Sequence, residues 1–242
     1  MKRIISIQKN VAVKFMLLVF VAISFIACNK ENLIIYEAGD IPGLGGTPGD
    51  LTGNPFELPS NVELIGDITG SGNYSGYWNH STGGQEIHYY GSGRGYVDLL
   101  LKLRNARSNP VTVTFPAATI LVSKTGRCQN GVLMQKVTVT IPANSEYHLC
   151  LSFYCGNAHK NAAGNSDVYV FSVVSNAKPL IDLCNKLKNK KINIEKFSNT
   201  STSDYNIYSG QGPKLQNIIW SVTDGEGISE SDIEYINSLP NN

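Results

Sequence analysis

The chain has 242 residues and a formal charge of +1, and charged residues make up only 16% of it. A chain so close to neutral lacks the basic surface that binds nucleic acid, which excludes that class of protein. Low charge together with abundant Gly, Ser, Asn, Thr and Tyr is typical of an exported, β-rich domain.

The first 28 residues combine a basic lead, a short apolar run and a small residue before a cysteine. Four basic residues and no acidic one precede an apolar run over residues 15–26. This run leads to Ala27 and Cys28. This order is typical of a secretory signal peptide over residues 1–27. The run is too short for a permanent membrane-spanning helix, which needs about 20 apolar residues. Removal of this signal changes the formal charge from +1 to −3.

The end of this signal, Phe25-Ile-Ala-Cys28, resembles the lipobox of bacterial lipoproteins, with Phe25 where Leu is usual. In that family the cysteine thiol carries diacylglycerol, the signal is cut before the cysteine, and the new amino terminus receives a further acyl chain such as palmitate. The resemblance implies lipidation at Cys28. It also implies a location in the bacterial cell envelope, on the outer rather than the inner membrane.

Residues 28–60 are expected to form the lipidated end and a flexible tether. Five glycines and four prolines lie between residues 40 and 60. Such a segment buries too little apolar surface to offset the entropy lost on ordering, so it should remain mobile and extended. The remaining residues, 61–242, are long enough for a single domain with one core.

Aromatic residues cluster between residues 62 and 96. They predict either an aromatic ligand platform, for instance for sugars, or rings that pack over the core of short strands. The platform would consist of Tyr74, Tyr77, Trp78, Tyr89 and Tyr90.

From Val97 onward, apolar and polar residues alternate with a period of two, separated by short turns. This pattern predicts antiparallel strands with one wet face, arranged as a β-sandwich. The predicted strands cover residues 97–104, 111–115, 119–123, 137–141, 147–155 and 167–174.

After Asn176 the apolar spacing becomes helical. Short helices are predicted over residues 179–187, 215–222 and 229–239, whereas residues 197–212 are polar and predicted to form a loop. Ser229 and Asp232 have the spacing of a capping box, with an acid in place of the usual Glu or Gln. The predicted fold class is therefore mainly β: an antiparallel β-sandwich with a helical C-terminal portion.

Four cysteines remain after Cys28, an even number that permits two disulfides in an exported protein. Cys155 lies on the apolar face of its strand and Cys184 on the apolar stripe of its helix, so these two are expected to pair. Cys128 and Cys150 are then left for the second bridge.

Sequence patterns for other chemistry are weak. His148, Cys150, Cys155 and His159 are close in sequence, but alternate strand residues point in opposite directions, so a zinc site is not expected. No hydrolase, metalloprotease or nucleotide-binding motif occurs. We therefore predict no catalytic residue, no metal and no cofactor.

Two short motifs resemble the thioester domains of Gram-positive surface adhesins. Tyr154-Cys155 is similar to their aromatic-Cys motif, and the segment from Leu215 to Trp220, LQNIIW, is similar to their hydrophobic-Gln-x-x-hydrophobic motif. In that family the Cys sulfur and the Gln carbonyl form an internal thioester that captures an amine on a partner protein. The resemblance implies a bond between Cys155 and Gln216, which would exclude the disulfide between Cys155 and Cys184.

These patterns together predict a lipid-anchored module of the cell envelope that binds a protein or glycan partner, or acts in envelope assembly, without catalysis. Fimbria-like lipoproteins share this architecture. One alternative is a covalent adhesin with the thioester between Cys155 and Gln216. The other is a glycan-binding accessory lipoprotein that uses the aromatic platform.

Overall fold

A computed structural model describes most of the chain after the predicted signal. Cys28, Tyr74, Tyr77 and Trp78 lie outside the described residues, so the predictions made for them stay predictions. No helix in the described part is long and apolar enough to cross a membrane. The described residues are 33–71, 81–82, 85–93, 95–198 and 201–242.

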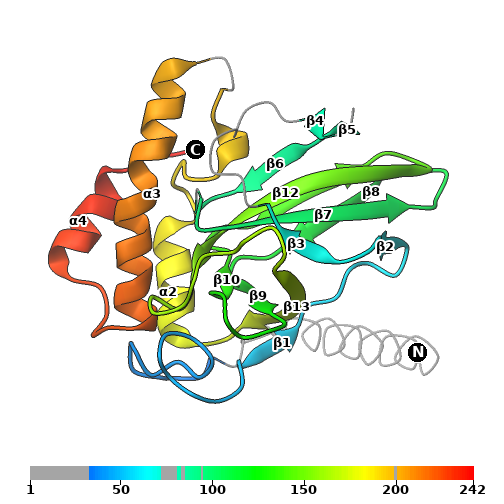
Figure 1. The fold of residues 1–242 in the computed structure, drawn as a ribbon. Helices are drawn as coiled ribbons and strands as arrows, with labels where there is room; N and C mark the ends of the chain where they lie inside the picture. Colours follow the sequence, from blue (N-terminus) through cyan, green and yellow to red (C-terminus); the bar gives the residue numbers. More distant parts are fainter. Residues whose placement is uncertain (1–32, 72–80, 83–84, 94, 199–200) are drawn as a thin grey trace, which may run out of the picture. The chain divides into compact units, whose positions relative to one another are not determined.

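Six strands of the larger sheet close into a barrel (Figure 1). The mainly β fold with a helical C-terminal portion is confirmed, but the strands form a closed barrel rather than a clear sandwich. The reason is the length of β12, which pairs with β7 over most of its course and with β10 at its end. In order around the barrel the strands are β7 (Val97–Asn105), β3 (Ile68–Gly70), β13 (Val168–Ser175), β9 (Thr119–Ser123), β10 (Gly131–Val132) and β12 (Ser145–Cys155).

Shorter strands extend this barrel. Strands β1 (Gly53–Pro55) and β2 (Val62–Leu64) pair with β13 and β7. Strand β6 (His88–Gly91) runs parallel to β12, so the sheet is not wholly antiparallel. Two separate two-stranded sheets consist of β8 (Val111–Phe115) with β11 (Val137–Ile141), and β4 (Ser81–Thr82) with β5 (Gln85–Glu86).

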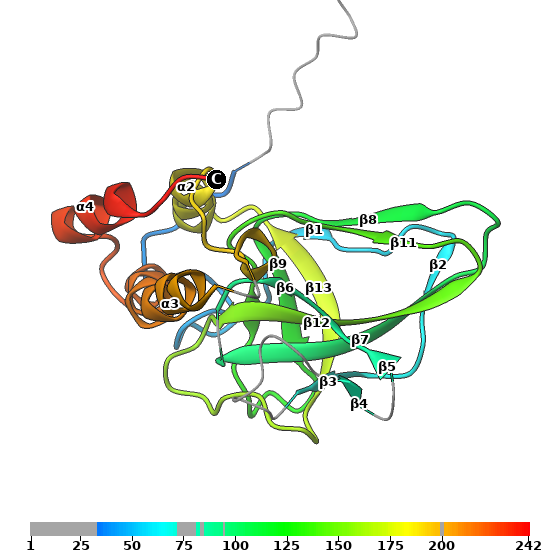
Figure 2. The ribbon, with the colours of Figure 1, turned by 90° about the horizontal axis from the view of Figure 1, so that it is seen from above.

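The α-helices of the described part gather at one end of the barrel, as two perpendicular views show (Figures 1 and 2). The capping box is confirmed, because the side chain of Ser229 accepts from the Asp232 amide and that of Asp232 accepts from the Ser229 amide. The helical elements are α2 (Lys178–Leu187), the 3-10 turn η1 (Ile194–Lys196), α3 (Thr202–Thr223) and α4 (Glu230–Ser238).

Helix α3 begins at Thr202, more than three turns before the predicted start at residue 215, so the predicted loop over residues 197–212 is wrong beyond its start. Ser201 caps the helix by accepting a hydrogen bond from the Asp204 amide at 3.1 Å. Tyr208 and Gln211 are buried, and Tyr208 packs in a small cluster with Phe197. The first half of α3 consists mainly of polar residues and glycines. It was not predicted, because a helix is recognised in a sequence by the periodic spacing of its apolar residues.

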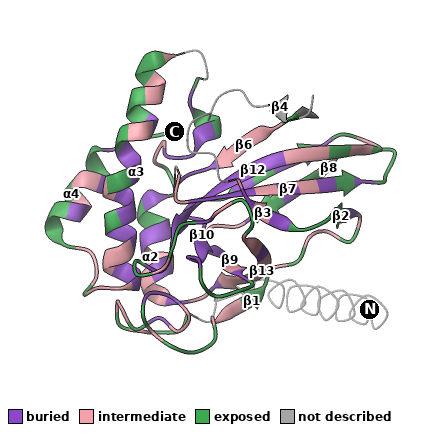
Figure 3. Cartoon of the chain, in the orientation of Figure 1, coloured by how far each residue is buried: buried purple, intermediate pink, exposed green. Residues whose placement is uncertain are grey.

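Two hydrophobic cores lie on the two faces of β12 (Figure 3). Leu151, Phe153 and Cys155 point into the barrel core. Tyr154 points the other way, into a second core shared with α2, α3 and α4. Because strand side chains alternate between faces, the aromatic residue rather than the cysteine faces the helices.

Residues 33–60 are packed against the domain, which corrects the prediction of a mobile tether for this stretch. Ile41 and Leu44 are buried in the helix-side core. Gly45 has φ +56°, and a Cβ there would come within 2.0 Å of the Thr223 carbonyl oxygen. Glycine serves here for close backbone approach rather than for flexibility.

Candidate functional site

The backbone of Cys155 lies at a point where one neighbouring strand has ended. The last register pair between β12 and β7 is Phe153 with Val97, whereas Cys155 still pairs with Gly131 of β10 on the other edge. Phe153 and Cys155 present their N–H and C=O groups to the same edge, because this direction alternates along a strand. The N–H and C=O of Cys155 therefore need another partner.

Gln216 of α3 supplies that partner through its side chain. The Cys155 N–H donates to Gln216 Oε1 at 2.8 Å, and Gln216 Nε2 donates to the Cys155 carbonyl oxygen at 2.9 Å. Both residues are 0% exposed, although they are 61 residues apart in sequence. The structure thus brings together the two residues of the sequence motifs, cysteine and glutamine.

Helix α3 holds Gln216 between the two cores. Leu215 and Ile219, on either side of it, belong to the helix-side core. Trp220, one turn further on, packs against the barrel core that contains Cys155. Gln216 is therefore fixed at the junction of barrel and helices by apolar contacts on both sides.

The Cys155 side chain belongs to the barrel core, and the Gln216 carboxamide lies at the edge of the strand beside it. The two hydrogen bonds hold the carboxamide alongside the edge of β12, whereas a strand side chain stands roughly perpendicular to the sheet. Burial, and secondarily the charge of Asp98, raise the pKa of the Cys155 thiol, so it is neutral at pH 7.

Two aromatic residues line the same place. The rings of Tyr96 and Trp220 meet edge to face, with centroids 6.3 Å apart. Burial is the main factor that raises the pKa of the Tyr96 hydroxyl. The sequence motif includes Trp220, but no pattern in the sequence pointed to Tyr96.

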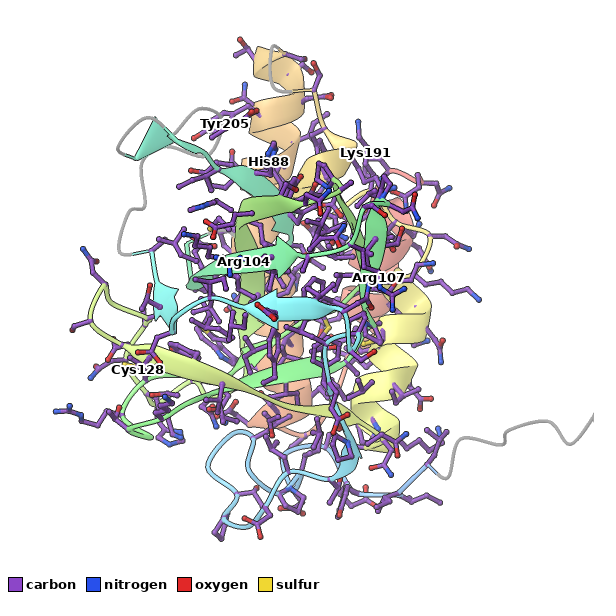
Figure 4. The ribbon with its side chains drawn as sticks, turned by 90° about the vertical axis from the view of Figure 1, so that its right-hand side faces the viewer. His88, Arg104, Arg107, Cys128, Lys191 and Tyr205 are labelled. Atoms are coloured by element: carbon purple, nitrogen blue, oxygen red, sulfur yellow. The ribbon has the colours of Figure 1, made fainter. Side chains whose placement is uncertain are left out.

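The predicted disulfides are not formed: the four cysteines that the structure describes are free and buried. Cys155 belongs to the barrel core and Cys184 to the helix-side core, on opposite sides of β12. The prediction failed because it assigned the helix-facing side of β12 to Cys155 instead of Tyr154. The second predicted bridge is also absent: Cys128, labelled in Figure 4, belongs to the barrel core, whereas Cys150 lies on the other face of β12.

The described members of the predicted aromatic platform are engaged in packing. Tyr89 packs against a small cluster with Phe197 and Tyr208, and burial is the main factor that raises its pKa to about 12. The Tyr90 hydroxyl is 2.8 Å from that of Tyr147. His88, labelled in Figure 4, stacks on the ring of Tyr147 at 4.3 Å. These contacts match the alternative of rings that cover the core.

No group of three or more His, Cys, Asp or Glu in the described ranges could hold a metal ion. Comparisons of this chain with family models, with curated proteins and with solved structures give no match. The strongest indication of function in the described residues is the contact between Cys155 and Gln216.

Proposed function

We propose that this chain is a covalent binding module, in which an internal thioester between Cys155 Sγ and Gln216 Cδ captures an amine on a partner. The observation that supports it most is the pair of hydrogen bonds between the buried Gln216 carboxamide and the backbone of Cys155. A thioester requires the sulfur and the carboxamide carbon to come together away from water. Both residues are fully buried, and the two hydrogen bonds hold the carboxamide beside residue 155.

The chemistry needs no cofactor. Sγ attacks Cδ, the bond from Cδ to Nε2 breaks, and the thiol proton leaves with the amide nitrogen as ammonia. An incoming primary amine then attacks the same carbon, the bond from Cδ to Sγ breaks, and the amine proton returns to the sulfur. The products are a new amide at Gln216 and the free Cys155 thiol, so each molecule reacts once and is not an enzyme.

Burial supports this reaction in a second way. Water competes with the amine for the thioester carbon, and complete burial of both residues keeps water away from it. Because the site is buried, the partner would have to reach it with a long and flexible primary amine. The lysine side chain of an envelope or host protein is an example.

We further propose that the module is attached to the outer membrane through lipid on Cys28. The basic lead, the apolar run and the lipobox-like ending support this attachment. Two or more acyl chains anchor a protein stably, whereas one is marginal. Cys28→Ala should therefore remain unprocessed or appear in the soluble fraction, and processed protein that still sediments with membranes after a high-salt wash would contradict lipid anchoring.

A labelled amine tests the covalent function. Folded protein is incubated with dansyl-cadaverine and digested, and the peptides are analysed by mass spectrometry. We expect a label on Gln216 in the wild type and in Cys184→Ala, and none in Cys155→Ala. Absence of label from the wild type, or label that persists in Cys155→Ala, would reduce the protein to a non-covalent binding module.

A further inference from the structure

The indole of Trp220 carries a buried donor that has no acceptor. Its Nε1 is shielded from solvent, and no hydrogen-bond partner for it occurs in the described part of the chain. Leaving a buried N–H without a partner costs about 1–3 kcal/mol. Such a donor is available to an oxygen that becomes an anion only during a reaction.

Trp220 and Gln216 share one face of helix α3. Trp220 follows Gln216 by four residues in α3, so the two side chains lie on the same face. Helical side chains lean toward the N-terminus and cover the preceding turn, which here is the turn of Gln216. The indole also meets the ring of Tyr96 edge to face and packs against the barrel core, to which Cys155 belongs.

A first donor to the same oxygen is already in place. The backbone N–H of Cys155 donates to Gln216 Oε1 at 2.8 Å. This oxygen remains on Cδ throughout the proposed chemistry and carries the negative charge of each tetrahedral intermediate. Two donors usually stabilise such an oxygen, one of them often the backbone N–H of the nucleophile itself.

We propose that the Trp220 indole N–H is the second donor of an oxyanion hole on Gln216 Oε1, completing the site begun by the Cys155 N–H. This inference rests on the proposed thioester. In the resting amide the single bond from Cys155 is sufficient. When Sγ or an amine adds to Cδ, the oxygen becomes an anion and moves out of the amide plane, where the indole N–H stabilises it.

The test removes the N–H and keeps the shape of the ring. At position 220, benzothienylalanine, introduced by amber suppression, has sulfur in place of the indole N–H, and Trp220→Phe is a second variant. Thioester formation after refolding and capture of methylamine are both followed by intact mass. Because both reactions pass through an anion on the same oxygen, we expect both to slow by a similar factor of about 100 or more.

Ile218→Val is the matched control, since it trims a buried side chain of α3 without changing a donor. It should lower the melting temperature slightly and leave both rates unchanged. A benzothienylalanine variant that forms the thioester and captures methylamine within threefold of the wild type would overturn this inference and leave the thioester intact. Slowing of only one reaction would equally overturn it. A wild type without the mass deficit would instead reject the proposed function itself.

Discussion

Cys155 and Cys184 are both buried free thiols, yet their surroundings differ in one decisive respect. Cys155 ends a strand of the barrel, and a carboxamide is hydrogen-bonded to its backbone. Cys184 lies in α2 among the aliphatic side chains of the helix-side core. Burial raises the pKa of both thiols, to about 12 for Cys184. The difference in chemistry therefore comes from the neighbour of the sulfur, and neither burial nor pKa distinguishes the reactive cysteine from the structural one.

The same contrast applies to two glutamines of α3. Gln216 makes two hydrogen bonds to Cys155, whereas neither amide atom of Gln211 has a partner among the described residues, although it is buried too. Burial alone again fails to identify the functional residue. Substitutions at Cys155 and Cys184, and at Gln216 and Gln211, should therefore have different effects.

The largest effect is expected from the replacement of Gln216 by methionine, which has a similar shape and no hydrogen-bonding amide. In a Cys155→Ala background, where no thioester can form, Gln216→Met leaves the N–H and C=O of residue 155 without partners. At about 1–3 kcal/mol for each group, the free energy of unfolding should fall by roughly 2–6 kcal/mol, measured by urea denaturation.

Gln211→Met in the same background is the control. Because it removes a buried amide that lacks partners, it should leave the stability unchanged or raise it. Equal losses from the two substitutions would show that the contact between Gln216 and Cys155 has no special energetic role.

Thioester formation should accelerate steeply with pH. The attacking species is the thiolate, and the pKa of Cys155 is raised well above its usual value. Below that pKa the thiolate fraction grows tenfold per pH unit, so the rate should rise about 100-fold between pH 7 and pH 9. Refolding reduced protein at each pH and following ammonia loss by mass measures it. A rate that does not change with pH would indicate that the neutral thiol attacks or that another step is limiting.

The smallest effect concerns Cys184, which we expect to be purely structural. Its pKa is raised to about 12 by burial, so between about pH 8.5 and pH 12 the unfolded chain loses this proton and the folded chain keeps it. Stability is therefore fully present below pH 8.5 and falls as the pH rises. From pH 7 to pH 10, Cys184→Ala should lose about 1–2 kcal/mol less stability than the wild type.

Leu180→Val, in the same core, should shift stability equally at both pH values because it does not titrate. If Cys184→Ala follows the wild-type pH dependence, Cys184 is not responsible for that loss.

The sequence predicted the strands and the C-terminal helices because their apolar spacing follows the strand and helix periods. Closure of the barrel was not predictable, since it depends on which strands become neighbours. The packed segment around Gly45 was mistaken for a tether, because composition does not reveal close backbone approach. The short motifs identified Cys155 and Gln216 as candidates. The predicted direction of the Cys155 side chain, toward the helices, was wrong, because an alternating pattern does not show which face of a strand meets the helices.

The intact mass of the folded, purified protein tests the central claim most directly. A thioester between Cys155 and Gln216 makes the chain lighter by the mass of one ammonia, and incubation with ammonia or methylamine restores or exceeds the original mass. We predict this deficit in the wild type and in Cys184→Ala, and the full mass in Cys155→Ala and in Gln216→Met. A wild type with the full mass, folded and reduced at pH 9, would contradict the thioester.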